Sequence, residues 1–173
     1  SGKTVDTFAK SLDDYPSTYN FHESRDYVDY TDDIYVGYRY FETIPGAAEK
    51  VVYPFGYGLS YTTFDVETVS AGVVNSNCTS CTTTAGLTDA DIDIEAGKLY
   101  AKVRVTNTGK FSGKEVVQVY IAKPQGKLGK PAKELVAFEK TRDLQPGESQ
   151  LITLTWEIND MASYDDLGKV KKS

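Results

Sequence analysis

The chain has 173 residues, of which 40% are hydrophobic and 25% charged, so it is long enough for one domain with an extension or for one large β-sandwich. Its net charge of −6 argues against nucleic acid and anionic membranes as partners, because both bind basic surfaces. No stretch approaches the ~18 consecutive apolar residues that a membrane-spanning helix needs.

Residues 1–61 are rich in tyrosine and poor in aliphatic side chains. They hold ten of the thirteen tyrosines, and their apolar positions follow neither the period of a helix nor that of a strand. Such a segment cannot bury a core of its own, although tyrosine can lie against another surface while its hydroxyl stays hydrated. We therefore predict that residues 1–52 pack on a larger body of protein.

Within this segment, residues 34–41 are rich in β-forming side chains, and we expect a strand there. Tyr35, Tyr38 and Arg39 are candidate substrate-pocket or interdomain contacts, because an arginine among tyrosines can clamp a hydroxyl-rich ligand or an acidic partner. The competing interpretation is that the three residues pin the segment to a neighbouring catalytic domain. We expect His22, the only histidine, to be an ordinary surface residue.

Residues 53–64 combine two glycines and a proline with five aromatic rings. This composition indicates tight backbone bends beside large packed side chains. We interpret the stretch as the hinge between the N-terminal segment, residues 1–61, and a self-contained β module, residues 62–173.

From Thr62 onward, short alternating runs separated by turn signals predict an antiparallel β-sandwich of immunoglobulin or fibronectin type III kind. Strands are expected at 64–69, 99–106, 116–121, 133–142 and 150–156, with a loop at 70–86 and turns at 107–109 and 144–148. The expected inward-facing side chains are Leu99, Ala101, Val103, Val105, Val117, Val119, Ile121, Val136, Phe138, Ile152, Leu154 and Trp156. Five strands are clear where such a sandwich has about seven. We therefore expect the module to lack its last strand, which a second polypeptide would supply.

Cys78 and Cys81 have the C-x-x-C spacing of redox-active pairs and zinc sites. Redox pairs open a helix, and none is expected here. A zinc site needs two further ligands, and the chain has a single histidine. We interpret the two cysteines as a structural pair in a Ser/Thr-rich loop and expect no metal.

Several motifs together resemble glycoside hydrolase family 3. They are YVGYR at 35–39, PFGYGLSYTT at 54–63, VTNTGKFSGKEVVQVY at 105–120, KEL at 133–135 and LQPGES at 144–149. The resemblance covers nearly the whole chain, with Ala9 in place of the family's usual proline and Tyr57 in place of a common histidine. It implies that residues 1–61 are the tail of the second, α/β sandwich catalytic domain with an interdomain linker. Residues 62–173 would then be the fibronectin type III-like domain that follows it.

The resemblance implies a parent enzyme of β-glucosidase type that releases terminal non-reducing β-D-glycosyl residues by a retaining mechanism. That mechanism needs two carboxylates about 5–5.5 Å apart. In the family these lie on a TIM-barrel domain and further upstream in the second domain, and no residue here matches either one. The adjacent acid pairs at 13–14, 32–33 and 165–166 lie in polar turns, and we expect them to be solvated. We expect no catalytic residue, metal or cofactor in this chain.

The expected partners are the remaining polypeptide of the same enzyme, with its TIM-barrel and α/β sandwich domains, and the β-glucoside substrate of the whole. The alternative is a stand-alone carbohydrate-binding or interaction module. That module needs exposed aromatic rings on one sheet face, and the pattern offers only Tyr100 and Tyr120 there. We expect a bacterial cytoplasmic location, with secretion left open.

Overall fold

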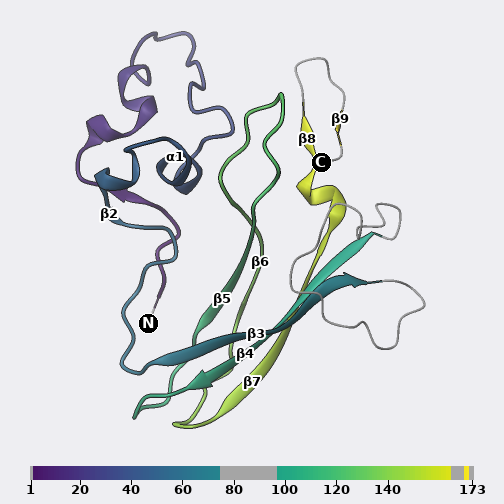
Figure 1. Ribbon diagram of the computed structural model, residues 1–173. Coiled ribbons are helices and arrows are strands. Elements are labelled where there is room, and N and C mark those ends of the chain that lie inside the picture. Colours follow the sequence, from purple (N-terminus) through teal and green to yellow (C-terminus); the bar gives the residue numbers. More distant parts are fainter. Residues whose placement is uncertain (1, 75–96, 165–169, 172–173) are drawn as a thin grey trace. The chain divides into compact units, whose positions relative to one another are not determined.

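The computed structural model describes residues 2–74, 97–164 and 170–171 (Figure 1). It is mainly β, with little helix, and the chain divides into two compact units. The first unit comprises residues 1–59 together with 122–134, and the second comprises residues 60–121 together with 135–173. The boundary between Leu59 and Ser60 lies inside the aromatic stretch 53–64.

The first unit is built from short elements. They are β1 (Phe8–Ala9), η1 (Leu12–Asp14), η2 (Pro16–Tyr19), α1 (Tyr38–Thr43), η3 (Ala48–Lys50) and β2 (Val51–Tyr53). The strands β1 and β2 pair antiparallel. Tyr15 organises this region, because its hydroxyl donates to the Thr7 carbonyl at 2.9 Å and accepts from the Ala9 amide at 2.9 Å.

The prediction of a strand at residues 34–41 is wrong, since Tyr38–Thr43 form the helix α1. Gly37 precedes the helix with φ +59° and ψ −127°, a backbone conformation that other residues rarely adopt. Phe41 is 1% exposed and its ring meets that of Tyr15 edge-on, with centroids 5.5 Å apart. Burying this ring outweighs the strand preference of the aromatic side chains around it.

The tight bends expected in the aromatic stretch are confirmed. Gly56 has φ +78°. Gly58 lies so close to the N-terminal backbone that a Cβ on it would be 2.4 Å from the Gly2 carbonyl oxygen. Thr4 ties the same two segments together, because its hydroxyl donates to the Pro54 carbonyl at 2.7 Å. Only glycine fits at position 58, as the close-packing interpretation requires.

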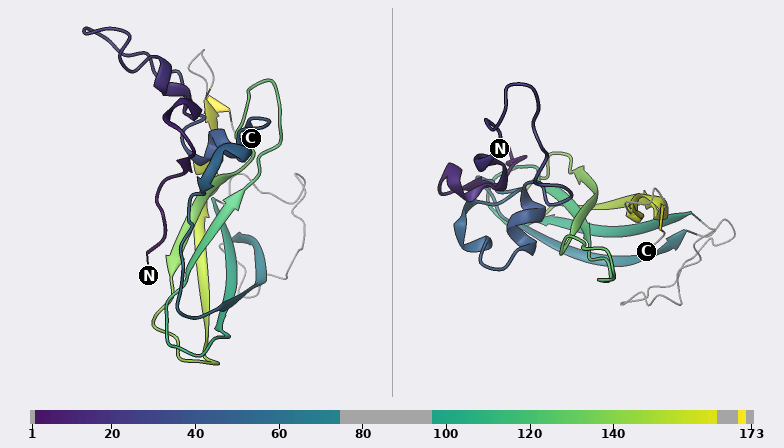
Figure 2. Two further views of the ribbon diagram at one scale, coloured as in Figure 1. Left: turned by 90° about the vertical axis from the view of Figure 1, so that its left-hand side faces the viewer. Right: turned by 90° about the horizontal axis from the view of Figure 1, so that it is seen from above.

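The long strands of the second unit form two sheets (Figures 1 and 2). One has the order β3-β4-β7, formed by Phe64–Val74, Lys98–Asn107 and Ser149–Glu157, and the other pairs β5 (Val116–Ile121) with β6 (Glu134–Lys140). The turned views of Figure 2 show the long strands of this unit in two layers. The five expected strands are thereby confirmed. Shorter elements follow them, namely η4 (Ile158–Met161), β8 (Ser163–Tyr164) and β9 (Val170–Lys171).

The bounds of β3 differ from expectation. Residues 70–74 continue the strand instead of opening a loop, because Ser70 to Val74 pair with β4 as far as Lys98. The pairing register of the strand shifts between Thr68 and Ser70, and a prediction that assumes strict alternation of side chains misses such a shift. The rest of the expected loop, with Cys78 and Cys81, lies outside the described residues, as do Asp165 and Asp166.

The core lies between the two sheets of the second unit. Its buried members are Val103, Val105, Val117, Leu144, Ile152 and Leu154, with Phe64, Val119 and Ala137 packed against them. The inward row expected along β4 is confirmed, and so is that of β7 as far as Leu154, whereas Trp156 is half-buried. Tyr100 was expected to face outward, yet it is 7% exposed. Its ring lies over Gly72 on β3, where a Cβ would be 3.3 Å from the ring, and this contact shields it.

The prediction that Val136 and Phe138 are the inward-facing pair on β6 is also wrong. Ala137 packs against the core, while Phe138 is 69% exposed. Side chains alternate along a strand, so turning Ala137 inward turns Phe138 outward. Residues 135–138 are apolar at every position, and their pattern therefore does not set which of the two faces is buried.

The end of β4 is tied down by Asn107, which is fully buried. Its Oδ1 accepts hydrogen bonds from the Thr62 hydroxyl at 2.7 Å and the Gly109 amide at 3.0 Å. Its Nδ2 donates to the carbonyls of Phe111 and Leu144, both at 2.8 Å. All four hydrogen-bonding positions of the side chain are used, so one residue joins three segments of the sandwich.

The turn at residues 144–148 forms as expected. Gly147 has φ +79° and its amide donates to the Asn107 carbonyl at 2.8 Å. The Gln145 amide donates to the Glu148 carboxylate at 2.9 Å, and Arg142 pairs with the same carboxylate. These interactions, the backbone hydrogen bond foremost, lower the pKa of Glu148 below its ordinary value.

Candidate functional site

Tyr38 and Arg39 are the first two residues of α1 in the first unit, and Tyr35 lies three residues before the helix; all three are half-buried. The ring of Tyr38 packs on Phe55, with centroids 5.0 Å apart and planes at 39°. The guanidinium carbon of Arg39 lies 6.0 Å from the centre of the Tyr38 ring, at the outer limit of a cation–π contact. The aromatic stretch 53–64 thus supplies the surface on which Tyr38 rests.

Glu134 gathers two cations next to this helix. Arg39 Nη2 lies 3.7 Å from Glu134 Oε1, and Lys123 Nζ forms an ion pair with Glu134 Oε2. The side chains of Lys123 and Glu134 are only 8% and 16% exposed. Lys123 depends on this carboxylate, because removing Glu134 would leave the Lys123 charge buried without its partner.

Further contacts hold residues 122–134 against α1. Lys133 Nζ lies 3.0 Å from Glu42 Oε2, and the Ala132 amide donates to the Thr43 hydroxyl at 2.8 Å. Tyr35 reaches the same segment, since a Cβ on Gly129 would be 2.7 Å from the Tyr35 hydroxyl oxygen. The segment between β5 and β6 is therefore anchored to α1 by charge, by a hydrogen bond and by close packing.

The sequence analysis identified the residues on and before α1, but it missed the residues of segment 122–134 that contact them. Tyr35 and Arg39 do meet charged and backbone groups, but those groups come from a segment more than eighty residues further along the chain. Lys133 and Glu134 stood in a motif that was noted only for its resemblance. The available signal was the four lysines of residues 123–134 followed by a single glutamate, which predicts a charge cluster without locating its partner.

The acid pairs serve local structure. Asp14 closes a capping box with Ser11 and lies 3.3 Å from Lys50 Nζ. Asp13 and Asp33 are exposed, as expected of solvated turn residues, whereas Asp14 and Asp32 are half-buried. His22 is exposed and its ring lies beside that of Phe21. Among the described residues, no group of three His, Cys, Asp or Glu side chains is placed to hold a metal ion.

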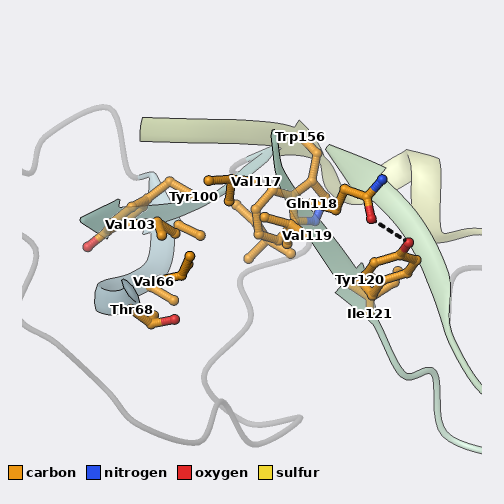
Figure 3. Close-up of a pocket in the computed structure, with 14 residues that line it drawn as sticks. Val66, Thr68, Tyr100, Val103, Val117, Gln118, Val119, Tyr120, Ile121 and Trp156 are labelled. Atoms are coloured by element: carbon orange, nitrogen blue, oxygen red, sulfur yellow. Dashed lines mark hydrogen bonds between the residues drawn. The ribbon is translucent and has the colours of Figure 1, made fainter. Parts of the chain in front are cut away.

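A hollow of about 380 Å³ opens in the second unit between β3, β4 and β5 (Figure 3). Its walls are mostly apolar, and Val66, Val103, Val117 and Val119 contribute to them. Trp156, expected in the core, is half-buried and lines this hollow. Its indole Nε1 is buried and has no hydrogen-bond partner among the described residues.

The outward face that a sugar-binding module would need is not formed by the two expected tyrosines. Tyr100 is buried and lines the hollow, and Tyr120 is half-buried. The Tyr120 hydroxyl donates to Gln118 Oε1 at 2.9 Å (Figure 3).

Within the described part of the chain, no helix is long and apolar enough to cross a membrane.

Comparisons with known proteins point to one family. Residues 115–171 match the fibronectin type III-like domain. β-Glucosidase A of Butyrivibrio fibrisolvens is 62% identical over 173 residues, which are 100% of this chain and 20% of that protein. A solved β-glucosidase of Paenibacillus barengoltzii has a TM-score of 0.80 at 48% identity, covering 95% of this chain and 16% of its own.

A third similar protein is the GH3 β-glucosidase of Bifidobacterium adolescentis. Its structure gives a TM-score of 0.78 at 30% identity over 99% of this chain and 22% of its own. The chain thus spans about a fifth of the length of the relatives that it matches, and the match falls in their C-terminal part.

Proposed function

We propose that this chain, which belongs to glycoside hydrolase family 3, is the non-catalytic supporting part of a β-glucosidase. Residues 1–61 are the tail of the second, α/β sandwich catalytic domain with its linker, and residues 62–173 are the fibronectin type III-like domain. The whole enzyme hydrolyses terminal non-reducing β-D-glycosyl residues with retention. Its partners are the TIM-barrel and α/β sandwich domains of the same enzyme and a β-glucoside substrate.

One observation supports this role most strongly: the first unit has many more large apolar side chains that are exposed than apolar side chains that are buried. Its buried apolar side chains are Phe41 and Ala47. Its exposed large apolar side chains are Val5, Phe8, Leu12, Tyr19, Phe21, Tyr27, Val28, Tyr30, Ile34, Val36, Ile44, Val52, Tyr53, Tyr57 and Leu59. A self-contained soluble domain does not expose apolar surface on this scale, which marks an interface with other protein.

The part of the first unit around Tyr53 illustrates the kind of surface involved. Tyr53 and Tyr57 lie with ring centroids 5.0 Å apart, and Phe8 meets Tyr53 edge-on at 6.4 Å. All three side chains are 40–50% exposed. Clustered half-exposed aromatic rings are typical of the anchors of protein interfaces. In this proposal they face the catalytic domains of the parent enzyme.

Retaining hydrolysis places a nucleophile and an acid/base carboxylate about 5–5.5 Å apart across the scissile bond. In this proposal both come from the rest of the enzyme. Tyr35, Tyr38 and Arg39 contribute by fixing α1 and residues 122–134, so that the second catalytic domain keeps its shape at this edge. Their role is to position protein, not to move protons.

The alternative is a stand-alone carbohydrate-binding or interaction module. The positions of Tyr100 and Tyr120 weigh against sugar stacking on that face of the sheet, because a buried or half-buried ring cannot stack on an insoluble glucan. The exposed aromatic rings lie mainly in the first unit, which favours a protein partner.

The proposal is tested by assaying the purified 173-residue chain on an aryl β-glucoside. We expect no turnover above the buffer rate, because this proposal gives the chain no nucleophile and no acid/base. Turnover that follows the chain through two further purification steps would contradict the non-catalytic assignment. Retention of the chain on insoluble glucan would favour the alternative.

A further inference from the structure

Residues 122–134, which we call the strap, belong to the first unit although the strands on either side belong to the second. The structure describes the strap throughout, and it contains no helix and no strand before Glu134 (Figure 1). No ladder of backbone hydrogen bonds therefore fixes it. Its two ends are already held side by side, because β5 and β6 pair in one sheet. Opening the strap breaks its contacts with α1 and leaves both strands in place.

The most buried ion pair of the strap joins its own two ends. The side chains of Lys123 and Glu134 are 8% and 16% exposed, and they pair with each other. A second internal tie is the hydrogen bond that Gln125 Nε2 donates to the Lys130 carbonyl at 3.1 Å. Because these interactions lie within the strap, they persist when it leaves α1. The strap can therefore move as one piece.

The ion pairs that hold the strap on α1 are open to water. Lys133 Nζ lies 3.0 Å from Glu42 Oε2, and these side chains are 43% and 30% exposed. Arg39 Nη2 lies 3.7 Å from Glu134 Oε1, and the Arg39 side chain is 36% exposed. Ion pairs in contact with water add little to stability, and salt screens them. The attachment to α1 is thus weaker than the closure of the strap on itself.

The strap and the rest of the first unit carry opposite net charge. The strap has four lysines and one glutamate, whereas residues 1–59 have five lysines and arginines against ten aspartates and glutamates. Exposed charges attract one another over about 10 Å at 0.1 M salt, but over only about 3 Å at 1 M. The attraction that closes the strap therefore falls as the ionic strength rises.

We propose that the strap is an electrostatic latch on α1, closed at low ionic strength and opened by salt while the second unit stays folded. In the closed latch Gly129 lies against the Tyr35 hydroxyl, and the Ala132 amide donates to the Thr43 hydroxyl at 2.8 Å. Opening frees Tyr35 and the end of α1 for other contacts. The inference rests on contacts within this chain and holds whatever the chain does.

The test follows amide hydrogen exchange of the 173-residue chain at about 0.05 M and about 0.5 M NaCl. The Ala132 amide reports on the latch, because its hydrogen bond to Thr43 exists only while the strap is closed. We expect its exchange to accelerate about tenfold at the higher salt concentration. The amides of β4, a strand that pairs with both β3 and β7, report on the second unit and should exchange equally under both conditions.

Two charge variants test the electrostatic origin of the latch. Glu42→Gln removes the partner of Lys133 and should accelerate Ala132 exchange about threefold at low salt, with no added effect at high salt. Glu49→Gln is the matched control, because it removes the same charge from an exposed residue of the same unit and keeps the pair of Glu42 with Lys133. This control should exchange as the unaltered chain does.

Two glycine variants test where the strap rests. A Cβ at position 129 would be 2.7 Å from the Tyr35 hydroxyl oxygen, so Gly129→Ala should accelerate Ala132 exchange about tenfold at low salt. Gly126→Ala is the matched control, because a Cβ there meets no atom within 4 Å. Adding Tyr35→Phe to Gly129→Ala removes the colliding oxygen, leaves the nearest ring carbon at 3.9 Å, and should close the latch again.

Three outcomes would overturn the proposal. One is Ala132 exchange that is the same at both salt concentrations. Another is a joint acceleration at Ala132 and along β4, which would mean that the strap opens only when the whole chain unfolds. The third is an equal effect of Gly129→Ala and Gly126→Ala, which would mean that the strap does not rest on Tyr35. None of these readouts involves hydrolysis, so they leave the proposed function to its own test.

Discussion

At the scale of single residues, the sandwich depends most on Asn107. The side chain makes four hydrogen bonds while fully buried, and each of them satisfies a group near the end of β4 or at the turn that precedes β7. No apolar residue can replace it, because the Thr62 hydroxyl, the Gly109 amide and the Phe111 carbonyl would then lose their hydrogen-bond partner. The sequence showed this residue only as the start of a turn, since hydrogen bonds to distant segments have no local signature.

Asn107→Ala should destabilise the 173-residue chain by about 3 kcal/mol, the cost of leaving several buried polar groups unsatisfied. Urea unfolding followed by Trp156 fluorescence measures the change. The control is Thr108→Ala, since the Thr108 side chain is exposed and hydrogen-bonds to the hydroxyl of the exposed Thr63. This change should cost less than about 0.5 kcal/mol. Equal losses in the two variants would refute the role given to Asn107.

At the scale of elements, α1 and residues 122–134 form one structural feature from two distant stretches of sequence. The strand propensity of residues 34–41 was misleading because the burial of Phe41 and the conformation of Gly37 favour a helix there. The charged residues of the later segment have a purpose only when α1 lies beside them. Local pattern therefore failed at this place, where the structure depends on contacts distant in sequence.

Glu134→Gln should loosen this feature, because Lys123 is 8% exposed and would keep a buried charge without its partner. A loss of about 3 kcal/mol in local stability is expected. Hydrogen exchange at the amides of α1, Tyr38–Thr43, measures it and should accelerate by more than tenfold. Glu139→Gln, an exposed change on the same strand β6, is the control and should leave α1 unaffected. An unchanged α1 in the Glu134 variant would mean that the ion pairs contribute nothing to the anchoring.

The strands show where the alternation of apolar and polar residues is sufficient to predict which side chains face the core. Along β4 and β7 the outward positions are polar except for Tyr100 and Leu151, and most of the buried row follows from the sequence. Along β6, residues 135–138 are all apolar, and the choice of Ala137 as the inward side chain depends on the opposite sheet. The same limit applies to Tyr100, which is buried only because β3 places Gly72 beneath its ring.

At the scale of the whole molecule, the two units differ in how much of a hydrophobic core each one buries within itself. The second unit buries a continuous core between two sheets, and the sequence predicted its class and its five strands. The first unit buries few apolar side chains and exposes many, which agrees with the expectation that residues 1–52 pack on other protein. The identity that we propose for that protein rests on relatives that are about five times longer.

The central claim is that this chain supports the catalytic domains of a β-glucosidase without taking part in bond cleavage. The most direct measurement is complementation of β-glucosidase A of Butyrivibrio fibrisolvens from which the matching segment has been deleted, because that protein is 62% identical over the whole chain. We predict that the deleted enzyme has lost most of its aryl β-glucosidase activity and regains it when this chain is co-expressed. Full activity of the deleted enzyme alone would contradict the account.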